Sequence, residues 1–183
     1  MRKITFLKSF VLFAGLIFSL DLNAQLHSPP ACGENYTLDW TAGATASNEY
    51  DWLPAGSLSN TYTDVDGSGI DITVSFTGDT GSLGVWSTQT PSVGNNSSTL
   101  YEGLDLITYG LSTTGITCTM TFSSPIYALS FDMHHVNTTG VSGDKYTIYA
   151  TTKTGEIILP TFTNSATPSY VSNNATGVVD ATG

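Results

Sequence analysis

Basic residues are scarce in this chain, and the scarcity excludes a class of partners. The 183 residues contain five Lys plus Arg against fifteen Asp plus Glu, and the net charge at pH 7 is −10. A surface with this balance repels phosphate groups, so we predict no binding to nucleic acid. It also leaves the carboxylates with few basic partners, and Ca²⁺, which binds through oxygen ligands, can take that role outside the cell.

The common catalytic motifs are missing as well. The sequence has no Gly-x-Ser-x-Gly elbow, no His-Glu-x-x-His motif and no Gly-rich phosphate-binding loop. Glu102 and Asp105 lie close together in the sequence, but a glycosidase needs two carboxylates at a defined separation in space. We therefore predict that the chain is not an enzyme and that it requires no cofactor.

One apolar run is long enough to form the hydrophobic part of a targeting segment, and it lies at the N-terminus. Residues 10–20 (FVLFAGLIFSL) carry no charge, follow a short basic segment, and are too few to span a bilayer, which takes about 20 apolar residues. We predict a cleaved signal peptide over residues 1–24, an extended segment over 25–35, and a secreted or cell-surface protein without a transmembrane segment. An uncleaved membrane anchor fits less well, because polar sequence follows directly. Cleavage removes three of five basic and one of fifteen acidic residues, leaving a net charge of −12.

Cysteine is also rare. Export exposes Cys32 and Cys118 to oxidising conditions, in which a disulfide between them can form. Cys118 also alternates with Ile116 and Met120, a pattern that suits a small apolar core residue. Both interpretations stay open.

Helical periodicity is absent, and apolar residues alternate with polar ones at period two instead. Glycine-rich and serine-rich turns separate the alternating segments. We predict an all-β fold over residues 36–183, an antiparallel β-sandwich of the jelly-roll or Greek-key type. The apolar positions of the five expected strands are Tyr36, Leu38 and Trp40; Ile70, Ile72, Val74 and Phe76; Ile116, Cys118, Met120 and Phe122; Tyr127, Leu129, Phe131 and Met133; and Tyr146, Ile148 and Ala150.

The strand pattern also predicts a core and a loop. The polar stretch 78–98 is expected to be a long surface loop, and the last residues resemble a strand entering a turn, so we expect the domain to continue beyond Gly183. The inner face of the sandwich is expected to include Ile72, Val74, Phe76, Ile116, Met120, Phe122, Leu129, Phe131, Tyr146 and Ile148.

The segment Asp64–Gly69 (DVDGSG) matches the first half of a calcium-binding loop. Asp64, Asp66 and Ser68 occupy alternate positions, and Asp71 follows, but the bidentate glutamate of the second half is replaced by Ser75. The competing interpretation is a hairpin turn that leads into the strand from Ile70. The turn is favoured, and a structural Ca²⁺ site at these four residues is kept as a hypothesis.

Two further groups of residues are weighed for binding. Asp132 and His134 share a strand face, whereas His135 points to the other, so a transition-metal site lacks ligands and a solvated face fits better. Among the aromatic residues Trp40, Tyr50, Trp52, Tyr62, Trp86 and Tyr101, most are expected in the core. Trp86 lies in the polar stretch and is the candidate for an exposed ring that stacks on a sugar.

Two segments resemble a known family. Residues 122–132 (FSSPIYALSFD) and 143–150 (GDKYTIYA), the second leading into Thr154-Gly155, are similar to strand signatures of jelly-roll-like, choice-of-anchor type modules in large secreted bacterial surface proteins. The resemblance covers residues 40–183. It implies a non-catalytic extracellular module, often adhesive, and this chain as an N-terminal fragment of a longer protein. Proteins of this kind often use the type IX secretion system, but the export route of this chain beyond the inner membrane stays open.

These observations lead to two functional hypotheses. The first is a non-catalytic surface or adhesion module whose partner is an extracellular glycan or a cell-surface protein. The second is an N-terminal accessory domain of a secreted hydrolase whose catalytic part lies outside this chain.

Overall fold

The computed structural model describes residues 34–85, 88–95, 102–110, 114–134, 136, 138–139, 142–163 and 170–181. These residues form short strands, mostly in antiparallel pairs, and two single-turn 3-10 helices, which confirms an all-β fold. The chain divides into two compact units, Met1–Ser124 and Pro125–Gly183, which are described separately. The predicted signal peptide and residues 25–33 of the extended segment lie outside the described residues.

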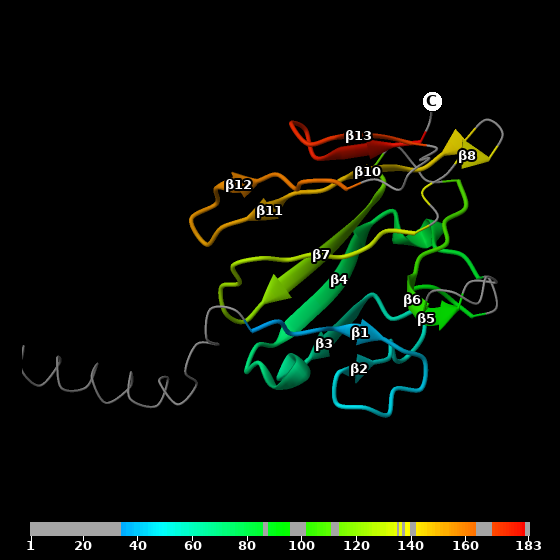
Figure 1. Ribbon diagram of the computed structural model, residues 1–183. Helices are drawn as coiled ribbons and strands as arrows, with labels where there is room; N and C mark the ends of the chain where they lie inside the picture. The colour runs from blue at the N-terminus through cyan, green and yellow to red at the C-terminus, as the bar shows by residue number, and fades with distance from the viewer. Residues whose placement is uncertain are drawn as a thin grey trace, which may run out of the picture. The chain divides into compact units, whose positions relative to one another are not determined.

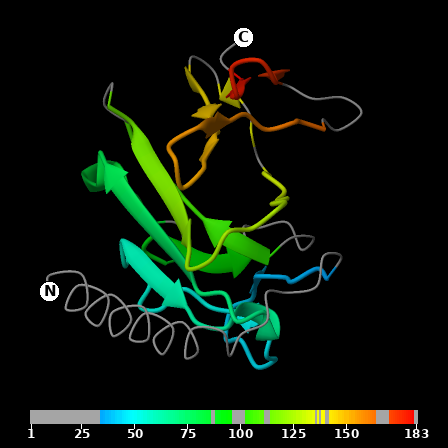
Figure 2. The same ribbon diagram turned by 90° about the vertical axis from the view of Figure 1, so that its left-hand side faces the viewer.

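A three-stranded antiparallel sheet organises the first unit (Figures 1 and 2). Its central strand β4 (Ile72–Gly78) pairs with β3 (Ser59–Tyr62) on one side and with β7 (Ile116–Phe122) on the other. Seven consecutive residue pairs join β4 to β7. Because residues opposite each other share a face, the alternating apolar positions of the two strands lie on one side of the sheet. The predicted strands at 70–76 and 116–122 are thereby confirmed, the first with a shift of two residues.

Shorter elements surround this sheet. The other elements of the first unit are β1 (Asp39–Trp40), β2 (Glu49–Tyr50), η1 (Val65–Gly67), η2 (Thr80–Ser82), β5 (Ser92–Asn95) and β6 (Glu102–Asp105). Strands β1 and β2 form a parallel pair, and β5 and β6 an antiparallel pair. The expectation of a surface loop over 78–98 is wrong for its described part, because this part contains η2 and β5 and buries Thr90 and Pro91.

Aromatic rings form the core of the first unit. The ring centroids of Trp52 and Phe76 lie 5.5 Å apart, and those of Trp40 and Tyr62 lie 5.4 Å apart. Both pairs meet edge to face, an arrangement that the ring quadrupoles favour. Val74 is fully buried among these rings, and Ile72, Ile116 and Met120 pack against the cluster partly buried. The sequence-based core is therefore confirmed for Ile72, Val74, Phe76, Ile116 and Met120, whereas Phe122 does not belong to this cluster.

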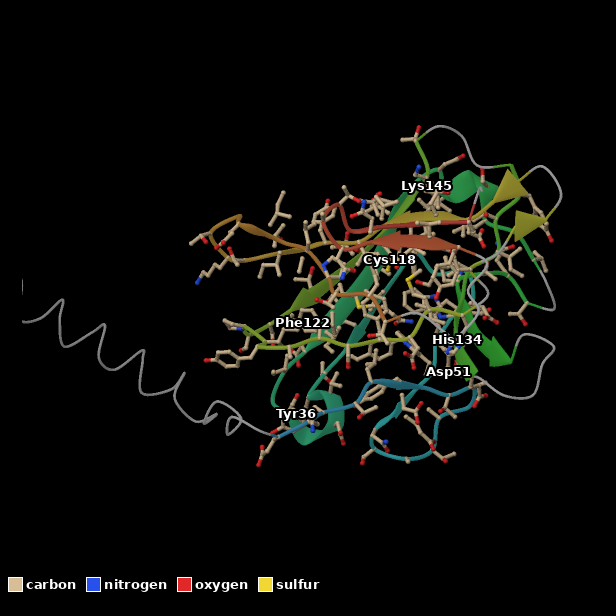
Figure 3. All side chains as sticks on the ribbon, turned by 45° about the horizontal axis from the view of Figure 1, so that its top comes forward. Tyr36, Asp51, Cys118, Phe122, His134 and Lys145 are labelled. Carbon is tan, nitrogen blue, oxygen red and sulfur yellow. The ribbon has the colours of Figure 1, made fainter. Side chains whose placement is uncertain are left out.

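The second unit consists of short strands. In chain order they are β8 (Thr138–Thr139), β9 (Ser142–Gly143), β10 (Lys145–Thr147), β11 (Ala150–Thr151), β12 (Ile157–Ile158), β13 (Val171–Asn173) and β14 (Val178–Asp180). Strand β14 lies between β10 and β13 in an antiparallel sheet, and β11 with β12 and β8 with β9 form two hairpins. The expected strand 146–150 is thus divided between β10 and β11. Lys145, labelled in Figure 3, bridges β10 to β14 through an ion pair of 2.7 Å with Asp180.

The expected strand over residues 127–133 does not form. The described residues 125–134 contain no strand, and the side chains of Tyr127, Leu129 and Phe131 are exposed. Tyr146 is also exposed, at the edge of its sheet. The prediction of a buried inner face is therefore wrong for Leu129, Phe131 and Tyr146. Alternating apolar residues form a buried face only where neighbouring strands complete the backbone hydrogen-bond ladder and a second layer of the protein covers that face.

Candidate functional site

The segment considered for Ca²⁺ forms a closed hairpin turn between β3 and β4. The Asp64 carboxylate accepts a hydrogen bond from the Gly69 amide at 2.7 Å, and the Asp71 carboxylate accepts one from the Asp64 amide at 3.0 Å. The Ser68 hydroxyl accepts one from the Ile70 amide at 3.0 Å. Asp64 adopts a left-handed conformation with φ of 51°, which aspartate tolerates better than most residues. The turn predicted from the sequence is confirmed.

Asp66 links this turn to the N-terminal part of the unit. Its carboxylate accepts a hydrogen bond from the Thr37 amide at 3.0 Å, and its own amide donates to the Tyr50 hydroxyl at 2.7 Å. The structure therefore brings Asp64, Asp66 and Asp71 into one turn, but it uses each carboxylate as an acceptor for a backbone amide. Within the described part of the chain, no three His, Cys, Asp or Glu side chains are grouped closely enough to hold a metal ion. The Ca²⁺ hypothesis stays a prediction.

Asp132 and His134 lie in the stretch 125–134, where the structure describes no strand, and both are exposed. The expectation that Asp132 and His134 share a strand face is therefore wrong. His135 is outside the described residues.

Most of the aromatic residues noted in the sequence belong to the core. Trp52 and Tyr62 are buried, and Trp40 and Tyr50 pack against them partly buried. Burial raises the pKa of the Tyr62 hydroxyl, with a smaller contribution from the nearby Asp51 carboxylate. Trp86, the candidate sugar platform, lies outside the described residues, as does Tyr101.

A different aromatic residue, Tyr109, is both exposed and held in place. Tyr109 follows β6 and has 63% of its surface exposed. Its hydroxyl donates a hydrogen bond to the Val85 carbonyl at 3.1 Å, and its backbone amide donates to the Ser82 carbonyl at 2.9 Å. Both ends of the residue are therefore fixed to residues 82–85, which immediately precede Trp86.

Gly84 leaves the space that the Tyr109 ring occupies. A Cβ atom at position 84 would come within 2.2 Å of Cε2 and 2.5 Å of Cδ2 of that ring. Any side chain larger than hydrogen would therefore push the ring away. The Gly84 amide also donates to the Ile107 carbonyl at 2.8 Å, which ties the two segments together beneath the ring. We call the Tyr109 ring, with Gly84 and Val85, the tyrosine platform.

Uncharged hydrogen-bonding groups support the platform. The Thr90 hydroxyl, which is buried, donates to the Gly84 carbonyl at 2.9 Å. The Gln89 side-chain amide makes longer contacts, 3.3–3.5 Å, with the carbonyls of Leu83, Gly84 and Thr90. All three of these contacts use Nε2 of Gln89.

Sequence reasoning missed Tyr109. The one local signal in the sequence is that Gly110 follows Tyr109. In the structure Gly110 has a positive φ of 66° and marks a turn. Nothing in the sequence connects Tyr109 with Gly84, because the two residues meet through the pairing of remote segments, Leu83 with Thr108 and Gly84 with Ile107.

The thiol of Cys118, labelled in Figure 3, is free. It lies opposite Phe76 on the edge strand β7, and partial burial of the sulfur raises its pKa to about 11, although the residue as a whole is exposed. Cys32 lies outside the described residues, so the disulfide interpretation is left as a prediction.

Comparison with protein-family models, with curated proteins and with solved structures finds no match to this chain. Among the described residues, no helix has the length and apolar character needed to cross a membrane.

Proposed function

We propose that this chain is a non-catalytic extracellular module that binds a glycan through the tyrosine platform. The observation that carries the proposal is an aromatic ring that is mostly exposed and yet anchored by Val85 and seated on Gly84. Sugars present apolar C–H faces that pack on aromatic rings. A ring that is already immobilised loses little conformational entropy on binding, so more of the contact energy appears as affinity.

The proposed setting follows from the sequence. The signal peptide over residues 1–24 would direct the chain out of the cell, where adhesive modules meet glycans. We further propose a sandwich of jelly-roll type, related to the choice-of-anchor modules. The single-faced apolar alternation of β4 and β7 supports this architecture, because it is the pattern of a sheet that has one face in a core.

Binding of the mature chain, residues 25–183, to a polysaccharide panel tests the proposal. Affinity gel electrophoresis and calorimetry would measure it. Tyr109→Ala removes the ring and is expected to weaken binding roughly tenfold, which corresponds to about 1.4 kcal/mol. Gly84→Ala should also weaken binding, because its Cβ displaces the ring. Tyr109→Phe keeps the ring and should retain most of the affinity.

Tyr127→Ala is the matched control. Tyr127 is 94% exposed and lies in the second unit, so its removal should leave glycan binding unchanged. Thermal unfolding of each variant separates loss of the platform from loss of the fold. Undiminished binding by a folded Tyr109→Ala variant would contradict the proposal.

A further inference from the structure

The tyrosine platform lies in a unit with an extreme charge composition. Between Glu34 and Ser124 the sequence contains ten Asp and Glu and no Lys or Arg. Both lysines that remain after signal cleavage, Lys145 and Lys153, belong to the second unit. An anionic polymer that approaches the platform therefore meets a uniformly negative unit without a cation to pair with its carboxylate or sulfate groups.

The described groups that hold Tyr109 in place, by contrast, carry no charge. Tyr109 hydrogen-bonds the carbonyls of Val85 and Ser82, and its ring lies on Gly84. The side chains behind Gly84 are Gln89 and Thr90, which are also neutral. None of these contacts, which lie within the described residues, involves a carboxylate. The hydroxyl groups of a neutral sugar can hydrogen-bond to uncharged groups such as the side-chain amide of Gln89.

Several carboxylates of the unit are already committed to the protein itself. Asp51 accepts from the Gly43 amide at 2.8 Å, and Glu102 accepts from the Ala42 amide at 3.3 Å. Asp79 accepts from the Ser82 hydroxyl at 2.8 Å, close in sequence to the platform. These carboxylates fix loops in place, and they contribute to the field that opposes anions.

We infer that the ligand of the tyrosine platform is an uncharged polysaccharide, and that acidic polymers are not its ligands. This inference rests on the proposed glycan-binding function and adds the chemical class of the ligand. Recognition of a neutral sugar by stacking and hydrogen bonds depends little on salt, whereas recognition of a charged polymer depends strongly on it.

The experiment compares three classes of polymer at two salt concentrations. The mature chain and its Tyr109→Ala and Tyr127→Ala variants are titrated with neutral polymers (laminarin, mannan, xyloglucan, soluble starch), acidic polymers (alginate, polygalacturonate) and chitosan. Each titration is run in 20 mM and in 500 mM NaCl. We expect at least one neutral polymer to bind with dissociation constants within twofold at the two salt concentrations. That binding should weaken roughly tenfold in Tyr109→Ala and stay unchanged in Tyr127→Ala.

The remaining outcomes separate the inference from the function on which it rests. Tyr109-dependent binding of alginate, polygalacturonate or chitosan overturns the inference about ligand class and leaves the glycan-binding function standing. Neutral binding that loses more than tenfold between low and high salt also overturns the inference. If none of the polymers binds, or if binding survives Tyr109→Ala in a folded variant, the proposed function is overturned together with the inference.

Discussion

The carboxylate of Asp66 accepts a hydrogen bond from the backbone amide of Thr37, 29 residues earlier in the chain, at 3.0 Å. The same kind of contact recurs in the first unit, where Glu49 accepts from the amides of Thr45 and Ala46 at 2.9 and 3.0 Å. Residues 34–124 contain no Lys or Arg, and several carboxylates in this stretch thus accept hydrogen bonds from backbone N–H groups instead. Such bonds have an ionised acceptor and are stronger than neutral ones.

The Asp66–Thr37 contact can be tested by changing its acceptor. Asp66→Ala removes the hydrogen bond and places alanine at a φ of 52°, so we expect a loss of about 2 kcal/mol in the free energy of unfolding, about half from each cause. Asp66→Asn retains an acceptor oxygen and tolerates this φ, so it should lose less than about 0.5 kcal/mol. Urea unfolding provides the measurement, with the exposed Asp39→Ala as a control. Equal losses for the alanine and asparagine variants would contradict the assignment.

Calcium binding at Asp64, Asp66, Ser68 and Asp71 is tested by thermal unfolding of the mature chain in millimolar Ca²⁺ and in chelator. A site that binds only the folded state would stabilise it by about 2.7 kcal/mol at a hundredfold excess over Kd. If these residues form the site, the shift should disappear in Asp66→Ala. Equal melting temperatures in Ca²⁺ and chelator would mean that these carboxylates bind their amide partners and no Ca²⁺. A shift in melting temperature that survives Asp66→Ala would place a Ca²⁺ site elsewhere.

Acid should remove the contribution of Glu49. Hydrogen bonds from the Thr45 amide, the Ala46 amide and the Thr45 hydroxyl hold the pKa of Glu49 below its ordinary value of 4.5. A lowered pKa means that the folded state favours the ionised form. The stabilisation is therefore complete above pH 4.5 and is lost as the pH falls through the lowered pKa.

We expect Glu49→Gln to be less stable than the native chain at pH 7 and to approach it in stability as the pH falls below 4. Thermal unfolding between pH 7 and pH 3 measures this convergence. Glu156→Gln is the matched control, because it changes an exposed glutamate elsewhere in the chain in the same way. A constant gap between Glu49→Gln and the native chain across this range would refute the interpretation.

Cys118 should react slowly for a thiol. Burial raises its pKa from 9.0 to about 11, so at pH 8 the thiolate fraction is about a hundredfold lower than for an ordinary cysteine. Alkylation of a Cys32→Ser variant by iodoacetamide, followed by mass spectrometry from pH 7 to pH 11.5, measures the titration. Unfolding in urea should restore the ordinary rate. A midpoint near 9.0 in the folded variant would show that the thiol is not desolvated.

The local sequence pattern was sufficient to predict some elements of the fold and insufficient to predict others. Strand β7 has the bounds that its alternation predicts, and the hairpin at Asp64–Gly69 forms where glycines and aspartates mark a turn. Both features depend on neighbouring residues in the chain. The alternation over residues 127–133 is equally regular but produces no strand, because a strand also needs a partner at its edge. The sequence does not indicate which segment would pair with residues 127–133.

The sequence by itself determined the all-β class, the acidic character and the core positions of β4 and β7, since period two and composition are properties of a local segment. Only the tertiary structure decided which side chains meet across long separations. It brought the Tyr109 ring against Gly84. It also brought the carboxylate of Asp66 within hydrogen-bond distance of the amide of Thr37. The reason is physical: a hydrogen bond or a ring contact depends on distances of a few ångströms, and those distances are set by the pairing of remote segments.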